Sequence, residues 1–141
     1  MPNRVTAAAR RIAAARACGR CEYCQTPERF VPEALSIEHI VPRSRGGASG
    51  AENLYLACQG CNNHKYIRVS ARDPVTERQV PLFHPRKHRW QDHFAWSPDA
   101  TMVIGLTAIG RATVEALRLN RPGLVALREA LVAFGVHPPE S

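Results

Sequence analysis

The spacing of apolar and polar residues in the first half of the chain predicts a helix, two short strands and the beginning of a second helix. Residues 3–17 have the apolar spacing of a helix, and Gly19 is suited to end it. Residues 35–41 alternate apolar and polar side chains as a strand does, and residues 54–57 form a second short strand. The segment from residue 62 onward can begin a helix. The apolar stripe predicted for the first helix consists of Val5, Ala9, Ile12 and Ala13.

A hairpin and one buried strand are predicted next along the chain. Residues 66–72 and 78–83 flank the sequence DPVT at 73–76, which is typical of a turn between two strands. Residues 102–106 form a short apolar run that predicts a buried strand.

Two helices are predicted in the last third of the chain. Thr107 is a good N-cap for a helix over residues 108–119. Pro122 suits the first turn of a final helix that runs to Phe134, with Gly135 directly after its end. The mixture of strands and helices indicates an α+β fold.

Length and charge narrow the class of protein. The chain has 141 residues, of which 45% are hydrophobic, enough for one domain with its own core. No apolar run approaches the 18 or so residues of a membrane span, so we expect no membrane partner. The net charge of +7 favours a polyanionic partner, and 17 of the 19 basic residues are arginine, which binds phosphate through two donors. The arginine- and alanine-rich start resembles a transit peptide in composition, but it runs directly into a cysteine motif, which favours a basic amphipathic helix.

Five cysteines are present, and four of them form two Cys-x-x-Cys pairs, Cys21/Cys24 and Cys58/Cys61. Pairs at this spacing are typical of reduced thiolates that hold a structural Zn²⁺, which also indicates a cytoplasmic setting. Cys18 is left over. It lies three residues before Cys21, so Cys18/Cys21 is a formal alternative to Cys21/Cys24, and we prefer the latter with Cys18 as a small buried or helix-end residue.

Between the cysteine pairs lie side chains suited to hydrolysis. Glu38 and His39 are adjacent, Asn53 follows fourteen residues later, and Asn62 comes directly after the last cysteine. A carboxylate, an imidazole and an amide can together hold a hard metal ion and a general base. A histidine taken alone is more often structural, so the argument depends on the combination.

Four segments carry a family resemblance: CEYC at 21–24, SIEHIVPRSRGG at 36–47, ENLYLAC at 52–58 and CNNHK at 61–65. Together they resemble the HNH endonuclease family, whose core is the ββα-metal finger. The resemblance covers about a third of the chain. It implies a ββα-metal core with structural zinc over residues 18–70. Together with the basic helix, assigned to 1–17, and a mixed strand–helix extension over 71–141 packed on that core, this gives the predicted organisation of the chain.

The resemblance also implies roles for individual residues. His39 would be the general base that activates water, and Glu38 and Asn62 would hold one divalent cation, usually Mg²⁺, although Mn²⁺ and Ni²⁺ tolerate such ligands. Asn53 would fix the loop and orient the His39 ring through the backbone. Two residues depart from the commonest family pattern, because Glu38 replaces an aspartate and Asn62 replaces a histidine.

Basic residues near this site are candidates for contacts with DNA phosphates. Arg43 and Arg45 lie in the glycine-rich loop after the first strand, and Lys65 matches a lysine often seen in the family motif. Solvated side chains are the competing interpretation for all three. Further along, Arg86, Lys87 and Arg89 could either grip a nucleic-acid backbone or form a wet rim around aromatic core residues.

The combined sequence evidence favours a metal-dependent endonuclease that acts on DNA with low intrinsic sequence specificity. A zinc-stabilised nucleic-acid-binding module without catalysis is the first alternative, and a protein-interaction domain is the second. The joint presence of Glu38, His39 and Asn62 argues against the non-catalytic module, which would not need them.

Overall fold

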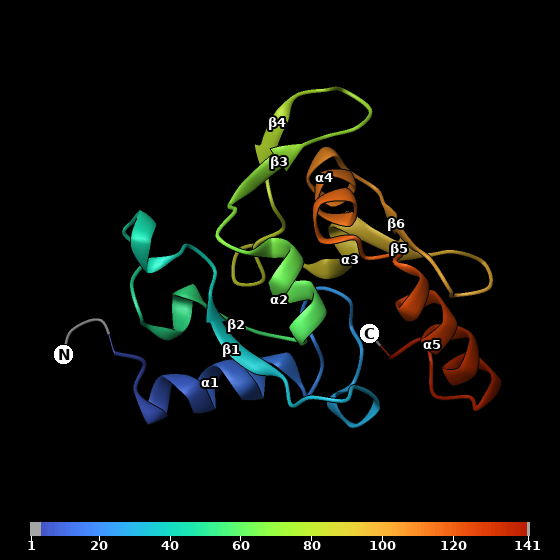
Figure 1. Cartoon of the computed structure of the whole chain (residues 1–141), viewed down its shortest axis with the longest axis horizontal. Helices are drawn as coiled ribbons and strands as arrows, with labels where there is room; N and C mark the ends of the chain where they lie inside the picture. The colour runs from blue at the N-terminus through green and yellow to red at the C-terminus, as the bar shows by residue number, and fades with distance from the viewer. Residues whose placement is uncertain (1–3, 141) are drawn as a thin grey trace. The chain divides into compact units, whose positions relative to one another are not determined.

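The computed structural model of the protein describes residues 4–140, which form two compact units (Figure 1). The first unit comprises the described residues up to Val69 together with His84–His88. The second comprises Ser70–Phe83 and the described residues from Arg89 onward. Both contain helices and short antiparallel strand pairs, so the fold class is α+β, as the sequence predicts. No helix within residues 4–140 is long and apolar enough to cross a membrane.

The first unit contains a long helix, a strand pair and a short helix, with three single 3-10 turns in the connections. Its elements in chain order are α1 (Ala7–Ala17), η1 (Glu28–Phe30), β1 (Ser36–His39), η2 (Arg43–Arg45), η3 (Ala51–Asn53), β2 (Leu54–Ala57) and α2 (Gln59–Lys65).

Both ends of α1 are capped by the residues at its boundaries. The Thr6 side chain accepts a hydrogen bond from the Ala9 backbone N–H at 3.0 Å, which makes Thr6 the N-cap. Cys18 ends the helix in the left-handed conformation, with φ of 55°, and Gly19 follows with φ of 71°. Gly19 was predicted as the end of this helix, and the structure places the end one residue earlier.

One face of α1 covers the strand pair. Ala9 and Ala13 pack against Leu54 of β2, where their small side chains allow a close approach of helix and strand. The prediction that Ile12 belongs to this apolar stripe is wrong, because half of the Ile12 side chain is exposed. The buried positions instead repeat every four residues, at Ala9, Ala13 and Ala17.

Strands β1 and β2 pair antiparallel, with Glu38 opposite Tyr55 and His39 opposite Leu54. All four residues of β2 are buried, which is consistent with a strand covered on both faces. Helix α2 then begins at Gln59 rather than after Cys61, because extended Cys58 acts as its N-cap. The order strand, strand, helix is therefore that of a ββα unit.

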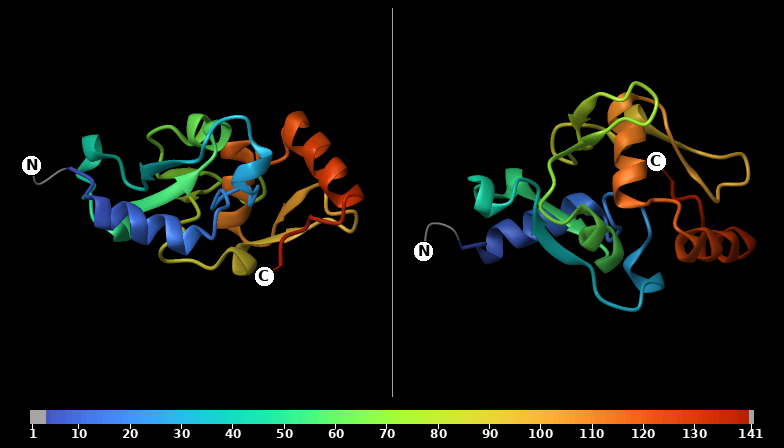
Figure 2. Two further views of the ribbon diagram at one scale, coloured as in Figure 1. Left: turned by 90° about the horizontal axis from the view of Figure 1, so that it is seen from below. Right: turned by 45° about the horizontal axis from the view of Figure 1, so that its top comes forward.

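The second unit consists of two further hairpins and three helices among the described residues. Helix α4 lies beside the β3–β4 hairpin in both views of Figure 2. The elements in chain order are β3 (Ser70–Arg72), β4 (Gln79–Pro81), α3 (Trp90–His93), β5 (Phe94–Trp96), β6 (Val103–Gly105), α4 (Ala108–Leu117) and α5 (Pro122–Ala133).

An ion pair between a buried aspartate and a partly exposed arginine joins the first of these hairpins to α4. Asp73, in the turn after β3, accepts hydrogen bonds from Nε and a terminal nitrogen of Arg111, each at 2.9 Å. The Arg111 guanidinium holds the pKa of the Asp73 carboxyl well below its usual range. The backbone N–H groups of Val75 and Thr76 also donate hydrogen bonds to the Asp73 carboxylate, and they stabilise the turn as an Asx-type turn.

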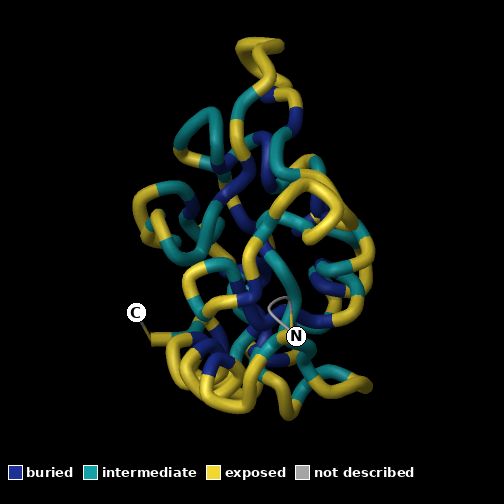
Figure 3. Tube along the Cα trace, turned by 90° about the vertical axis from the view of Figure 1, so that its left-hand side faces the viewer, coloured by how far each residue is buried: buried dark blue, intermediate teal, exposed yellow. Residues whose placement is uncertain are grey.

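The predicted strand 102–106 is buried only in part. Val103 is 2% exposed, but Ile104 on the opposite face is 44% exposed. Figure 3 shows how buried, intermediate and exposed stretches follow one another along the trace. The prediction of a buried strand therefore holds for one face only, because a hairpin strand covered on one face leaves every second side chain in solvent.

Candidate metal and nuclease site

Four cysteine sulfurs meet in the first unit. Cys21 and Cys24 lie in the loop after α1, and Cys58 and Cys61 lie at the start of α2. All four side chains are buried, and the four sulfurs lie within 4.8 Å of one another. Cys24 Sγ and Cys58 Sγ are 3.8 Å apart, and a tetrahedral zinc with Zn–S bonds of about 2.3 Å separates its sulfurs by about 3.8 Å. The donor set therefore fits a structural Zn²⁺, and Cys18 is exposed and outside the cluster.

The electrostatics of this cluster favour a bound cation. Burial raises the pKa of the Cys21 thiol well above its usual value. Hydrogen bonds from Cys21, Cys24 and Cys61 lower the pKa of Cys58. The pKa of Cys24 is lowered as well, and that of Cys61 is raised. The protein alone therefore favours the thiolate at two of the four cysteines and disfavours it at the other two. A divalent cation removes that conflict by neutralising several thiolates at once.

A charged pair supports the first cysteine loop from outside. Glu22 lies between Cys21 and Cys24, and its carboxylate accepts a hydrogen bond from the Leu56 backbone N–H at 2.8 Å and pairs with Arg86. The Arg86 side chain is only 6% exposed. The interpretation of Arg86 as a nucleic-acid contact is therefore wrong, because its guanidinium is already engaged in the interior of the first unit.

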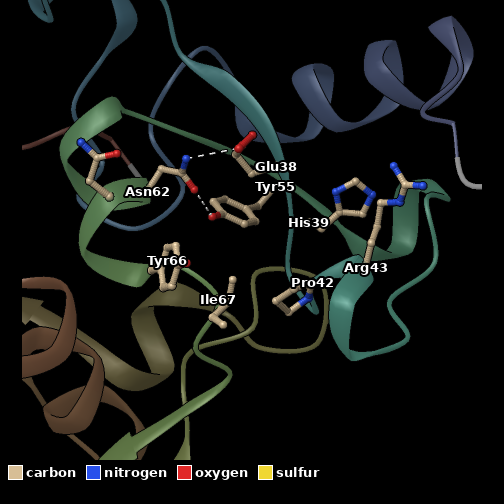
Figure 4. Close-up of a pocket in the computed structure, with 9 residues that line it drawn as sticks. Glu38, His39, Pro42, Arg43, Tyr55, Asn62, Tyr66 and Ile67 are labelled. Carbon is tan, nitrogen blue, oxygen red and sulfur yellow. Dashed lines mark hydrogen bonds between the residues drawn. The ribbon is translucent and has the colours of Figure 1, made fainter.

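A pocket of about 520 Å³ opens beside the strand pair and the end of α2 (Figure 4). Three of its lining side chains are linked by hydrogen bonds. The Tyr55 hydroxyl donates to Asn62 Oδ1 at 2.7 Å, and Asn62 Nδ2 donates to Glu38 Oε1 at 3.2 Å. Burial raises the pKa of Tyr55 well above its usual value, so its hydroxyl stays protonated as a donor. Glu38 and Asn62, far apart in sequence, are thus in direct contact.

His39 lines the same pocket from the end of β1. Its Nε2 shares a hydrogen bond with the Ser49 hydroxyl at 3.0 Å. Burial, followed by the positive charge of Arg43, lowers the pKa of His39 below its usual 6.5. The imidazole is therefore neutral at neutral pH, which is the state that can accept a proton. Ser49 had no signal in the sequence, because a serine in a glycine-rich loop is ordinary.

Asn53 holds the loop that follows His39. Its side chain accepts from the Val41 backbone N–H at 2.9 Å and donates to the carbonyls of Val41 and Ala48, at 2.9 and 2.7 Å. Its own carbonyl accepts from the Ile40 N–H at 2.8 Å. The loop held by these hydrogen bonds leaves no room for a side chain at Gly47, where a Cβ would lie 1.8 Å from the Val41 carbonyl oxygen. Asn53 thus contacts backbone next to His39, while the ring itself is bonded by Ser49.

The three expected phosphate contacts lie in different environments. Arg43 and Arg45 are exposed on η2, and Arg43 also lines the pocket. Lys65 is 1% exposed, and its ammonium donates to the Ile40 carbonyl at 2.9 Å. Lys65 also lies 5.3 Å from the centre of the Tyr55 ring. The structure corrects the expectation for Lys65, because a buried ammonium that is bonded to backbone does not reach a phosphate in solvent.

The first unit thus combines a ββα element order, four cysteines that can hold a metal ion, and a pocket lined by an acid, a histidine and an amide. The model of the HNH endonuclease family matches residues 21–68, about a third of the chain. That segment spans all four clustered cysteines as well as Glu38, His39 and Asn62. It supports a nuclease-type or nucleic-acid-binding function. Searches of curated proteins and of solved structures gave no match.

Replacement of one clustered cysteine should unfold the first unit. A structural zinc contributes roughly 10–16 kcal/mol to folding, as much as the whole stability of a typical domain. We expect Cys58→Ser to lose the single zinc and the cooperative unfolding of this unit, as measured by metal analysis and circular dichroism. Cys18→Ser is the matched control and should retain both. Full zinc content in a folded Cys58→Ser protein would contradict the assignment.

Lys65 should make stability depend on alkaline pH. Burial lowers its pKa from 10.5 to about 8, so the unfolded chain binds more protons between these values and the free energy of unfolding rises with pH there. We expect wild type to gain stability relative to Lys65→Met between pH 8 and 10, measured by denaturant unfolding. Exposed Lys87→Met is the control and should show no such change. A flat difference for Lys65→Met would show that the ammonium is not desolvated.

Proposed function

We propose that this chain is a metal-dependent endonuclease that hydrolyses DNA phosphodiester bonds, by nicking or double-strand cutting, in the cytoplasm. The observation that carries the proposal is the direct contact of Glu38 with Asn62 in a pocket that His39 also lines. Phosphodiester hydrolysis needs a base for water, a ligand set for a hard cation and positive charge for phosphate. Residues of this pocket can supply all three.

The chemistry of Glu38 and Asn62 suits a hard divalent cation such as Mg²⁺, with Mn²⁺ or Ni²⁺ as alternatives. Asn62 presents its amide nitrogen to Glu38 and its oxygen to Tyr55. For the amide oxygen of Asn62 to bind a metal beside Glu38, the amide must flip so that its oxygen and nitrogen exchange positions. The Tyr55 hydroxyl can accept a hydrogen bond as well as donate one. Tyr55 can therefore satisfy the amide in both orientations. A cation held by Glu38 and Asn62 would supply stabilisation of the negative charge that develops on the scissile phosphate and the leaving oxygen.

His39 is the proposed general base. If Nε2 donates its hydrogen to Ser49 Oγ, the lone pair is on Nδ1, which can then take a proton from water. The lowered pKa keeps this lone pair available at neutral pH. Asn53 supports the base indirectly, since it holds the loop between His39 and Ser49 in one conformation.

Arg43 and Arg45 are the proposed contacts to the DNA backbone. Both guanidinium groups are exposed on η2, within six residues of His39. The net charge of +7 attracts DNA without reading its sequence. We therefore expect binding that depends strongly on salt and only weakly on base sequence.

Removal of the imidazole should separate folding from catalysis. We expect His39→Ala to bind zinc and unfold like wild type but to nick supercoiled plasmid at least about 100-fold more slowly with Mg²⁺, because general-base catalysis contributes roughly 10²–10⁴. The plasmid assay uses EDTA as a metal control. Equal rates for His39→Ala and wild type would disprove the base assignment, and DNA retention without any wild-type cleavage would favour the non-catalytic binding module.

The acid limb of the pH–rate profile should respond to Arg43. Since Arg43 lowers the pKa of His39, Arg43→Gln should move the limb to higher pH. An exposed charge pair is worth at most about 1 kcal/mol and one pKa unit is about 1.36 kcal/mol, so the shift should stay below roughly 0.7 unit. The measurement is kcat at saturating DNA and fixed Mg²⁺ across pH 5–8. Arg45→Gln, in the same turn, should leave the limb in place, and an unmoved limb in Arg43→Gln would count against His39 as the titrating group.

A further inference from the structure

Tyr66 has an unusual backbone conformation at the edge of the pocket. It is the C-cap of α2, with φ of 51° and ψ of −129°. Two other helices also end on a non-glycine residue with positive φ, Cys18 and Arg118, but both lie in the left-handed helical region, with ψ of 36° and 57°. The conformation of Tyr66 is outside that region and disfavours any residue with a Cβ. A glycine would adopt it without strain.

Packing does not account for a tyrosine at this position. The Tyr66 residue is 72% exposed, so burial of the ring contributes little to folding. Ile67 beside it is 37% exposed, and both line the pocket that contains Glu38 and Asn62 (Figure 4). A large aromatic ring in solvent on a strained backbone is the kind of local cost that clusters at binding sites.

Hydrogen bonds hold the backbone on both sides of Tyr66. The Tyr66 N–H donates to the carbonyl of Asn62, the proposed metal ligand, at 2.8 Å, so Tyr66 lies one helical turn after that residue. The preceding residue, Lys65, is buried and bonded to the Ile40 carbonyl of the neighbouring segment. The Lys65 carbonyl in turn accepts from the Arg68 N–H at 3.1 Å. The chain is thus fixed on both sides of Tyr66 while its ring faces outward, which lowers the entropy cost of binding a flat ligand.

We propose that Tyr66 is a stacking platform for a nucleobase next to the scissile phosphate, and that it favours DNA in which this base is unpaired. The proposal rests on the proposed nuclease function of the same pocket. A base inside a regular duplex has both faces covered by its neighbours, so only an unstacked base can lie on the ring. The exposed guanidinium of Arg43 lines the same pocket and is available for the adjoining phosphate.

The test uses a short duplex with 2-aminopurine in a one-base bulge, and a fully paired duplex with the same probe. Binding is measured in the His39→Ala background with Mg²⁺, so that the DNA is not cut. We expect the protein with Tyr66 to bind the bulged duplex more tightly and to quench the probe by stacking. Tyr66→Leu should lose the quenching and at least about fivefold of the affinity for the bulged duplex, and Tyr66→Trp should restore both.

Two comparisons separate stacking from damage to the fold. Phe134 is 81% exposed in the second unit, and Phe134→Leu should leave affinity and quenching unchanged. Tyr66→Gly should unfold at the same temperature as the parent or higher, because it relieves the backbone, and should still lose quenching. This variant keeps the test decisive if Tyr66→Leu folds poorly.

The outcomes distinguish the stacking role from the nuclease function. If wild type cuts plasmid but Tyr66→Leu and Tyr66→Gly quench and bind like the parent, the stacking proposal is overturned and the nuclease function stands. Equal loss of affinity for paired and bulged duplexes would also overturn it, since stacking on an unpaired base affects only the bulged one. A wild-type protein that neither cuts plasmid nor binds either duplex would overturn both proposals.

Discussion

Four sulfur atoms join two parts of the chain that are separated by 33 residues, from 25 to 57, and the rest of the first unit depends on that closure. Closing so long a loop lowers the entropy of the chain, and the apolar contacts of a small core offset this cost only with difficulty. The free energy of metal ligation would offset it directly. The closure also sets the pocket. Cys58 is the N-cap of α2, and its carbonyl accepts from the Asn62 N–H at 3.0 Å, so Asn62 lies one turn after Cys58 and directly after Cys61 of the cluster. A zinc held by these sulfurs would therefore help to determine where Asn62 meets Glu38.

A second constraint acts on the other side of the pocket. Neighbouring residues of a strand point to opposite faces, so Glu38 and His39 would be separated if β1 continued. The strand ends at His39, and both side chains line one pocket. Asn53 then holds the following loop by three side-chain hydrogen bonds, and Ser49 of that loop contacts the imidazole. The orientation of His39 thus depends on a loop that is ordered by one amide, and Gly47 lets the backbone approach closely enough for this to happen.

Features that depend on local spacing were predictable from the sequence. The two Cys-x-x-Cys pairs, the strand Leu54–Ala57 and the helix cap at Thr107 follow from a few neighbouring residues, and the structure contains each of them. The predictions that proved wrong concern features that depend on contacts between distant segments. Nothing in the sequence near Lys65 indicates that its ammonium meets the Ile40 carbonyl, 25 residues away. Similarly, Ile12 is exposed because another side of α1 faces β2. That side carries Ala9 and Ala13, whose small side chains allow a close approach to Leu54.

The end of α2 shows how the metal cluster and the pocket are related in energy. Lys65 is a buried cation whose lowered pKa reflects incomplete compensation, and Tyr66 has a disfavoured backbone conformation. Each of these features costs stability, and they are adjacent, on the turn that follows Asn62. In a unit of about 70 residues, such costs would be a large fraction of the total stability. A zinc held by the four cysteines near the start of the same helix would contribute enough to offset them. The cluster therefore permits a strained and polar helix end beside the pocket, which a purely apolar core of this size would not sustain.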